Sequence, residues 1–493
     1  MPAWQGFEYS IVFEIVNWKT LLSANRPGQK SISSESYRSA FEQDYDRIIF
    51  SHPFRRLQDK TQVHPLPEHD FVHTRLTHSL EVSSVGRSLG KRVGEVILER
   101  HPELIPNFSL FDFGAIVAAA SLAHDLGNPP FGHAGEDALS DFFLEHISLR
   151  GNINDAEWND LIHFEGNAQG FRILNQHEYG MKLTAATLGA FTKYPCPSLF
   201  PSRDKSKKSQ KKFGFFQTEK EIFSALANQL ELLPTGGEAW CRHPLAFLVE
   251  AADDICYSII DLEDGCRLGL VSFDETVELL APILKTKLDR AKLAGDEGLN
   301  KKLGTLRAMS IGELIDSCTE IFLQQEEQIL NGKFDGALVD LCQFKDALKK
   351  ISEVSVQKIY RARQVVEIEA SGHEVLPGLL REFATAGTHL RQKGRSRKYD
   401  NLALLFPIEI SKAISQCPSQ YTLLRHVVDF VSGLTDRHAL SLYRKIKGII
   451  VLIIVPKSPT AHPVSIEVKY TECNAAKVEM FCEVHVFPPS VVL

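Results

Sequence analysis

The stretch FGAIVAAASLAHDLGNPPFGHAGED, residues 113–137, joins an apolar, alanine-rich segment to a polar segment that holds two histidines and three carboxylates. The first segment has the composition of a helix that is buried on several sides. Pro129 and Pro130 end this helix, because the residue before a proline avoids helical geometry. A further helix is expected after the Phe131-Gly132-His133 turn, so the stretch predicts helix, turn and helix.

The rest of the chain has the same helical character. Its long middle section is rich in Leu, Ala, Glu, Lys and Arg, and few glycines interrupt the periodic segments. Residues 73–98 predict a long amphipathic helix, and residues 243–265 predict another that follows Pro244. The chain has 493 residues, more than a single core usually holds. We therefore expect an all-α, multi-helix fold.

Composition excludes several classes of protein. A net charge of −7 argues against a surface that is basic throughout and binds duplex nucleic acid. The nine cysteines show no paired spacing, and no secretory leader opens the chain, so we expect a cytoplasmic protein with reduced thiols. The longest apolar run, residues 449–455, is far shorter than the roughly 20 residues of a membrane helix, so no membrane association is expected.

Two basic stretches, residues 203–212 and 391–398, are polar and rich in helix-breaking residues, so we expect loops. Their ordinary role is a solvated linker. The alternative is that they supply cations to a polyphosphate or a nucleic acid.

His124 and Asp125 are adjacent near the end of the buried helix. A neutral imidazole and a carboxylate on a rigid element are what a divalent metal binds, although most such pairs are a histidine beside a capping aspartate. His78, on the inner side of an earlier helix, and Asp253, in a later apolar helix, strengthen the metal interpretation. An unpaired carboxylate such as Asp253 is costly to bury.

Other polar side chains have a spacing that suits a shared site. His133 and Glu136, at positions i and i+3, can hydrogen-bond, and such a carboxylate orients the imidazole and raises its pKa. The alternative is a capping-box glutamate at a helix start. Arg75 lies one turn before His78 on the same face. Asp253, Tyr257 and Asp261 also share one helical face.

Six segments, in order, resemble the deoxyguanosinetriphosphate triphosphohydrolase family of the HD superfamily of metal-dependent phosphohydrolases. The resemblance extends from about residue 17 to about residue 447. The segments are RRLQDKTQV (55–63), HTRLTHSLEV (73–82), HDLGNPPFGHAGE (124–136), HFEGNAQGFRIL (163–174), EAADDICYSIIDLEDG (250–265) and VSGLTDRHALSLYRKI (431–446).

The resemblance implies a role for each matching residue. The metal ligands it implies are His78, His124, Asp125 and Asp253. His133 and Glu136 are implied in catalysis, near the attacking water or the leaving group. Residues implied to contact the substrate are Arg75, Asn167, Lys193, Tyr194 and Lys212 at the triphosphate, Tyr257 and Asp261 at the sugar, and Gln58 at the base. Residues 367–383 match the family only loosely, so no base-contacting residue is taken from them.

The implied reaction is hydrolysis of dGTP, or of dNTPs generally, at the α-phosphorus, which yields a deoxynucleoside and inorganic triphosphate. The ligand set suits Mg²⁺ or Mn²⁺, with Fe²⁺, Co²⁺ or Zn²⁺ as alternatives. A homo-oligomer, tetramer or hexamer, is also implied, with a second dNTP or single-stranded DNA as a regulator.

Two alternatives remain open at this point. One is another HD phosphohydrolase, such as a cyclic-dinucleotide phosphodiesterase or an alarmone hydrolase; against the former, Asn128 stands where that group typically has lysine. The other is a non-catalytic nucleotide sensor or single-stranded nucleic-acid binder.

The expected organisation has three parts. Residues 1–16 form a leader, residues 17–447 form the helical core, and residues 448–493 form an appendage of short strands or irregular chain. Within the core, the HD domain covers about residues 73–262 and a C-terminal helical part covers about residues 263–447.

Overall fold

The computed structural model describes residues 16–27, 37–63, 73–176, 179–201, 203–295 and 297–449. The predicted leader, except Val16, and nearly all of the predicted appendage lie outside these residues. The chain divides after Tyr443 into two units, 1–443 and 444–493, and everything described below as a site belongs to the first unit.

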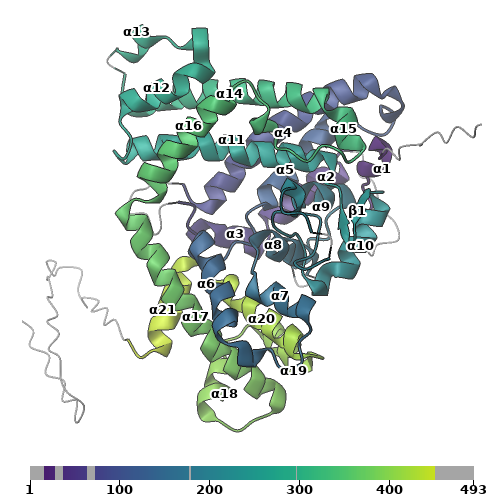
Figure 1. The fold of residues 1–493 in the computed structure, drawn as a ribbon, viewed down its shortest axis with the longest axis vertical. Coiled ribbons are helices and arrows are strands. Elements are labelled where there is room, and N and C mark those ends of the chain that lie inside the picture. Colours follow the sequence, from purple (N-terminus) through teal and green to yellow (C-terminus); the bar gives the residue numbers. More distant parts are fainter. Residues whose placement is uncertain are drawn as a thin grey trace, which may run out of the picture. The chain divides into compact units, whose positions relative to one another are not determined.

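Helices dominate the described residues, as the sequence predicts (Figure 1). The N-terminal half contains α1 (Trp18–Leu21), α2 (Ala40–Ile49), α3 (His52–Arg56), α4 (Arg75–Arg100), α5 (Leu110–Ala123), α6 (Gly132–Glu145), α7 (Asp155–Ile162), α8 (Gly166–Asn175), α9 (Ala185–Phe191) and α10 (Lys220–Gln229). The remainder contains α11 (Pro244–Arg267), α12 (Phe273–Leu284), α13 (Arg290–Leu293), α14 (Leu299–Gln324), α15 (Glu326–Leu330), α16 (Lys345–Val354), α17 (Arg363–Gln392), α18 (Arg397–Ala403), α19 (Ile408–Gln416), α20 (Gln420–Ser432) and α21 (Asp436–Ile446). The described residues also contain two short antiparallel strands, β1 (Pro234–Gly236) and β2 (Ala239–Trp240), and several short 3₁₀ segments. The prediction of an all-α fold is confirmed.

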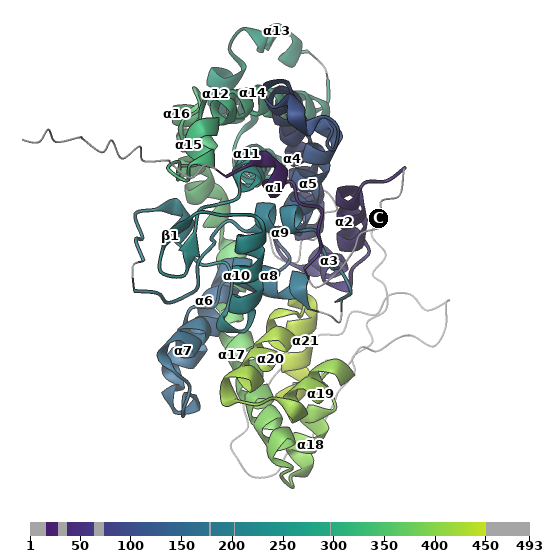
Figure 2. The same ribbon diagram turned by 90° about the vertical axis from the view of Figure 1, so that its right-hand side faces the viewer.

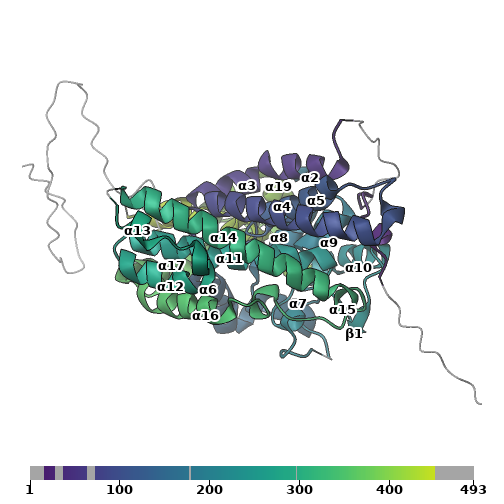
Figure 3. The same ribbon diagram turned by 90° about the horizontal axis from the view of Figure 1, so that it is seen from above.

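Helices α4 and α5 lie side by side because α4 has glycines where the two backbones meet (Figure 3). A Cβ atom on Gly90 would lie 2.7 Å from the carbonyl oxygen of Phe113, and one on Gly86 would lie 2.5 Å from Oγ of Ser121. Nearly every residue of α5 from Phe113 to Ala123 is buried. This close contact fixes the C-terminal end of α5 relative to the first turns of α4.

The predicted order of helix, turn and helix is present between α5 and α6, but both boundaries differ from the prediction. Bonds of the i→i+3 type replace the helical pattern from His124 to Asn128, so α5 ends before the prolines, and α6 begins within the expected turn. Helix α5 ends at Ala123, so His124 and Asp125 come directly after its last turn. Phe131 then adopts a left-handed conformation with φ of 65°, and α6 begins at Gly132. His133 and Glu136 therefore lie in the first turn of α6.

Helix α11 contributes Asp253 from its middle. It begins at Pro244, a favourable first residue, and the His243 side chain caps it by accepting a hydrogen bond from the Leu245 N–H. Buried apolar residues pack α11 against α4, α5, α9 and α14, and Figure 1 shows α14 running beside it. Asp253 therefore meets residues from α4 and α5 across this packed core.

The C-terminal helices form a group around α17. Helix α17 packs against α18, α19 and α20, and its N-terminal half lies along α6 (Figure 2). Gly372 of α17 makes room for the Phe131 side chain, since a Cβ there would lie 3.0 Å from the Phe131 Cβ. These helices thus contact the segment that carries His133.

The first basic stretch, residues 203–212, lies in the irregular segment before α10, as predicted. The second is only half loop, because residues 391–392 end α17 and residues 397–398 begin α18. Helix α1 is a single turn that ends at Leu21. Among the described residues, no helix combines the length and apolar content that crossing a bilayer requires.

Candidate active site

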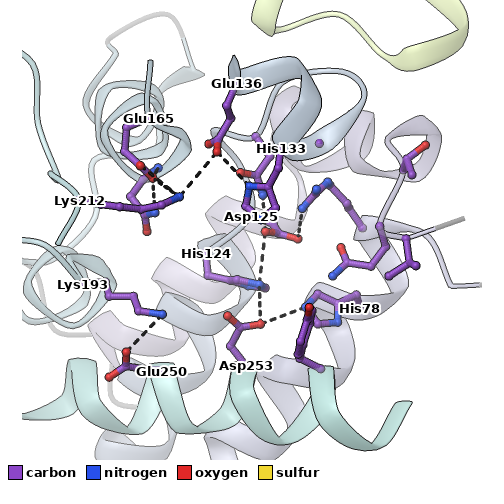
Figure 4. A pocket seen from close by; sticks show the side chains of 18 of the residues that line it. His78, His124, Asp125, His133, Glu136, Glu165, Lys193, Lys212, Glu250 and Asp253 are labelled. Carbon is purple, nitrogen blue, oxygen red and sulfur yellow. Dashed lines mark hydrogen bonds and ion pairs between the residues drawn. The ribbon is translucent and has the colours of Figure 1, made fainter. Parts of the chain in front are cut away.

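A cavity of about 500 Å³ lies where α4, α6, α11 and the ends of α5, α8 and α9 meet (Figure 4). Of the site residues that the sequence predicts, all but Gln58 and Asp261 line it. Side chains that are far apart in the sequence therefore share one space.

The predicted metal ligands meet at one side of this cavity. Ligand atoms of His78, His124 and Asp125 lie within 4.8 Å of one another. Oδ1 of Asp253 lies 3.2 Å from Nε2 of His78 and 3.5 Å from Nε2 of His124. Figure 4 shows Asp253 approaching the two histidines from α11. Two imidazole nitrogens and two carboxylates converge, as a divalent ion requires.

The hydrogen bonds around these residues fit a metal site. Nδ1 of His124 donates to the Ser121 carbonyl at 2.7 Å, which leaves the Nε2 lone pair for a metal. Asp125 accepts from Nη1 of Arg75 at 2.9 Å and from the Asn128 side chain. Burial alone would raise the pKa of Asp125, but Arg75 and the two histidines lower it, so the carboxylate is ionised and oriented.

His133 and Glu136 form the predicted pair. Nδ1 of His133 lies 3.0 Å from Oε2 of Glu136, and Oε1 of Glu136 accepts the Gly166 N–H at 2.8 Å. The hydrogen bond to Glu136 raises the pKa of His133. The His133 side chain is 82% exposed and lines the cavity, so its other ring nitrogen is accessible to a ligand or water. A fixed carboxylate therefore orients an imidazole that can exchange a proton there.

Cationic side chains line the cavity beside the predicted metal ligands. Lys212 lies 3.2 Å from Glu165 and 3.6 Å from Glu136, while Lys193 lies 3.3 Å from Glu250. Burial would lower the pKa of each lysine, but the neighbouring carboxylates raise both values, so both are charged. Together with Arg75 they form a cavity wall with three cations, each paired with a carboxylate, and such cations can bind a polyphosphate.

Asn167 and Tyr194 complete this wall. The Asn167 side chain donates to Glu165 at 2.7 Å, and the Lys193 ammonium group lies 5.8 Å from the centre of the Tyr194 ring. Lys212, the last residue of the first basic stretch, reaches the cavity, so part of that stretch does more than link two elements.

Two predicted residues lie behind or away from the cavity wall. Asp261 is buried and accepts a hydrogen bond from the Tyr360 hydroxyl at 2.7 Å. Tyr360 stacks on Tyr257 with ring centres 5.3 Å apart, so Asp261 supports an aromatic wall rather than lining the space. Gln58 is exposed, and Gln62, four residues further along, lines the cavity instead.

The sequence did not predict the contribution of the segment that leads into α17. Tyr360, Val365, Ile368 and Glu369 line the cavity. The spacing of Val365, Ile368 and Glu369 places them on one helical face, which was a readable signal. The spacing alone does not predict which other helices this face packs against.

Comparisons with known proteins agree with this geometry. Residues 75–157 match the HD domain family, and residues 342–445 match the phosphohydrolase-associated domain. An HD domain implies divalent metal binding, as the His-His-Asp cluster suggests.

Whole-length relatives are also known. A deoxyguanosinetriphosphate triphosphohydrolase-like protein of Synechocystis is 41% identical over 88% of this chain and all of its own length. A like-named Pseudomonas aeruginosa protein is 40% identical over 88% of this chain and 99% of its own. The deoxyguanosinetriphosphate triphosphohydrolase of Salmonella typhimurium is 30% identical over 83% of this chain and 94% of its own. The chain therefore belongs to the deoxyguanosinetriphosphate triphosphohydrolase family within the HD superfamily of metal-dependent phosphohydrolases.

Proposed function

We propose that this protein hydrolyses dGTP, or deoxynucleoside triphosphates generally, at the α-phosphorus and releases a deoxynucleoside and inorganic triphosphate. The observation that supports this most is the meeting of three groups in one cavity: the His-Asp cluster, the His133–Glu136 pair and the cations Arg75, Lys193 and Lys212. Few substrates other than a polyphosphate ester need all three.

The cations bind the triphosphate. Arg75 already donates to Asp125, so it sits between the metal ligands and the cavity and can offset charge on a phosphate that reaches the ion. Lys193 and Lys212 are paired with Glu250 and Glu165 in this structure, and substrate phosphates compete with those carboxylates for them.

A divalent ion, Mg²⁺ or Mn²⁺ in our proposal, would be held by His78, His124, Asp125 and Asp253 and would polarise a phosphate oxygen. His133 holds or releases a proton at its exposed ring nitrogen, and Glu136 keeps the imidazole oriented. His133 either donates this proton to the departing 5′-oxygen or accepts it from the attacking water. Tyr257, flat against the sugar and supported by Tyr360, excludes a 2′-hydroxyl.

A panel of the four dNTPs, supplied singly and in pairs with Mg²⁺ or Mn²⁺, tests the proposal when products are separated by chromatography. We expect triphosphate and deoxynucleoside in equal amounts. A deoxynucleoside monophosphate as first product contradicts the proposal. Nucleotide binding without turnover would support the alternative of a sensor. Turnover only in mixtures would show activation by a second dNTP.

A further inference from the structure

Asp436 is the first residue of α21 and is buried. It is far from the predicted site residues in the sequence, yet it accepts hydrogen bonds from two segments that line the cavity. Its Oδ2 accepts the Thr61 N–H at 3.0 Å and also the Thr61 hydroxyl. Its Oδ1 accepts the Phe131 N–H at 3.1 Å. One carboxylate, 1% exposed, therefore joins chain segments that are 305 and 375 residues away.

Both segments lead directly to the cavity. Phe131 has left-handed geometry and immediately precedes α6, so its position sets where His133 and Glu136 begin. A non-glycine residue in that conformation is strained, and persists where neighbouring contacts hold it. Thr61 lines the cavity next to Gln62 and pairs through a backbone bridge with Thr74, the residue before Arg75.

The neighbouring residue Lys60 also connects this turn to the C-terminal helices. Nζ of the buried Lys60 donates to the Asn128 carbonyl at 2.5 Å and to the Ser432 carbonyl at 2.9 Å. The proline turn between the metal ligands and His133 is thus held at Asn128 by Lys60 and at Phe131 by Asp436.

The chemistry of the contact requires a carboxylate. Two backbone N–H groups approach opposite oxygens of Asp436, and a backbone N–H can only donate. In an asparagine at this position, the NH₂ group would face one of the two backbone N–H groups in either orientation of the amide. The carboxylate accepts all three hydrogen bonds, while the amide leaves at least one buried donor unpaired.

We infer that Asp436 is a positioning residue that sets the location of His133 and Glu136 through the Phe131 N–H. The expected effect of Asp436 on kcat rests on the proposed function, whereas its expected effect on the position of the turn does not. It gives the C-terminal helices a task in the reaction beyond lining the cavity.

The test compares Asp436→Asn with Glu326→Gln, a matched control. Glu326 is also a buried carboxylate with three donors, Trp18, Arg100 and His101, and it lies at the other end of α4. We expect Asp436→Asn to lower kcat by about 10- to 100-fold, as small displacements of a catalytic group do, while metal content stays full. Glu326→Gln should lower the melting temperature but keep kcat. Equal losses of kcat in the two variants would overturn the inference.

A double-mutant cycle separates positioning from general damage. If Asp436 acts through His133, then adding Asp436→Asn to His133→Ala should lower kcat by no more than about twofold further. Losses that multiply would mean that Asp436 acts elsewhere. Thr61→Val, which removes one of the three donors, is the milder variant and should show the same pattern on a smaller scale if Asp436→Asn folds poorly.

Amide hydrogen exchange provides a readout that needs no activity. Asp436→Asn should speed exchange in the peptides that cover residues 128–133 and 60–63, and Glu326→Gln should not. Unchanged exchange at 128–133 would overturn the inference even if kcat falls. If the wild-type protein releases no triphosphate, the proposed function fails, and the exchange result still decides the role of Asp436.

Discussion

At the scale of single residues, we propose that metal binding and proton transfer belong to different side chains within residues 121–137. His124 and Asp125 belong to the cluster, and His133 with Glu136 forms a separate pair that lines the same cavity. We therefore predict that His133→Ala keeps the metal and the affinity for dNTP but lowers kcat by roughly 10²- to 10⁴-fold. Glu136→Gln should cost less, because it removes only the orienting charge.

The combined variant sharpens this prediction. A proton-transfer group and its orienting partner act as one unit, so the double variant should be little slower than His133→Ala alone. Steady-state kinetics and metal analysis of the three proteins measure this. Near-normal turnover in His133→Ala, or loss of its metal, would show that the two roles are assigned wrongly.

Asp253 is predicted to be a metal ligand supplied by α11. Asp253→Ala should lower metal affinity by at least about 10-fold and remove the stabilisation that the ion gives the wild-type protein, because binding to the folded state alone raises stability. The control is Asp261→Asn, two turns further along the same face, which contacts Tyr360 instead. Metal content by mass spectrometry and melting temperatures with and without chelator measure both effects. Full metal occupancy in Asp253→Ala would remove it from the ligand set.

At the scale of elements, the contact between α4 and α5 positions His78 against His124, whose ring centres lie 5.3 Å apart. Gly90→Ala should lower the free energy of unfolding by about 1–3 kcal/mol, the usual cost of overpacking, since the new Cβ meets the Phe113 backbone. Gly312→Ala in α14 is the control, because nothing lies within 4 Å of its Cβ. It should stabilise the helix by about 0.5–1 kcal/mol. Denaturant titration compares them, and a neutral Gly90→Ala would contradict the packing argument.

The N-terminus of α11 predicts a pH dependence of stability. Burial lowers the pKa of His243 from 6.5 to about 4, and its ring donates to the Leu21 carbonyl while accepting the Leu245 N–H. The unfolded chain binds a proton below about pH 6.5 and the folded chain does not, so stability falls between pH 6.5 and pH 4, by about 3 kcal/mol in full.

His243→Asn preserves the cap, because an asparagine oxygen can accept the same N–H. The variant should therefore lose less of its melting temperature between pH 7 and pH 5 than the wild-type protein does. Identical losses would mean that His243 does not carry this dependence.

The sequence predicts those elements whose boundaries depend on residues close by in the chain. The order of buried helix, proline turn and second helix was predictable, because alanine composition, Pro129 and Pro130 act within a few residues. The exact ends were not, since α5 stops at Ala123, before the prolines. The place of Asp253 in a buried helix was also predictable from local composition. By contrast, the contacts of Tyr360 and Asp436 depend on which helices meet, and no local pattern contains that information.

At the scale of the whole molecule, the C-terminal helices bring Tyr360 and Glu369 to a cavity whose predicted metal ligands come from residues 78–253. The predicted HD and C-terminal parts therefore contribute to one site. The predicted domain boundaries, homo-oligomer and cytoplasmic location stay predictions.

Hydrolysis of dGTP in water enriched in ¹⁸O tests whether water attacks the α-phosphorus. Attack of water on the α-phosphorus, with the 5′-oxygen leaving, places the label in triphosphate and leaves the deoxynucleoside unlabelled. We predict that mass spectrometry of the single-turnover products finds one ¹⁸O atom in triphosphate and none in deoxyguanosine. Label in deoxyguanosine, or release of dGMP with pyrophosphate, would contradict the account.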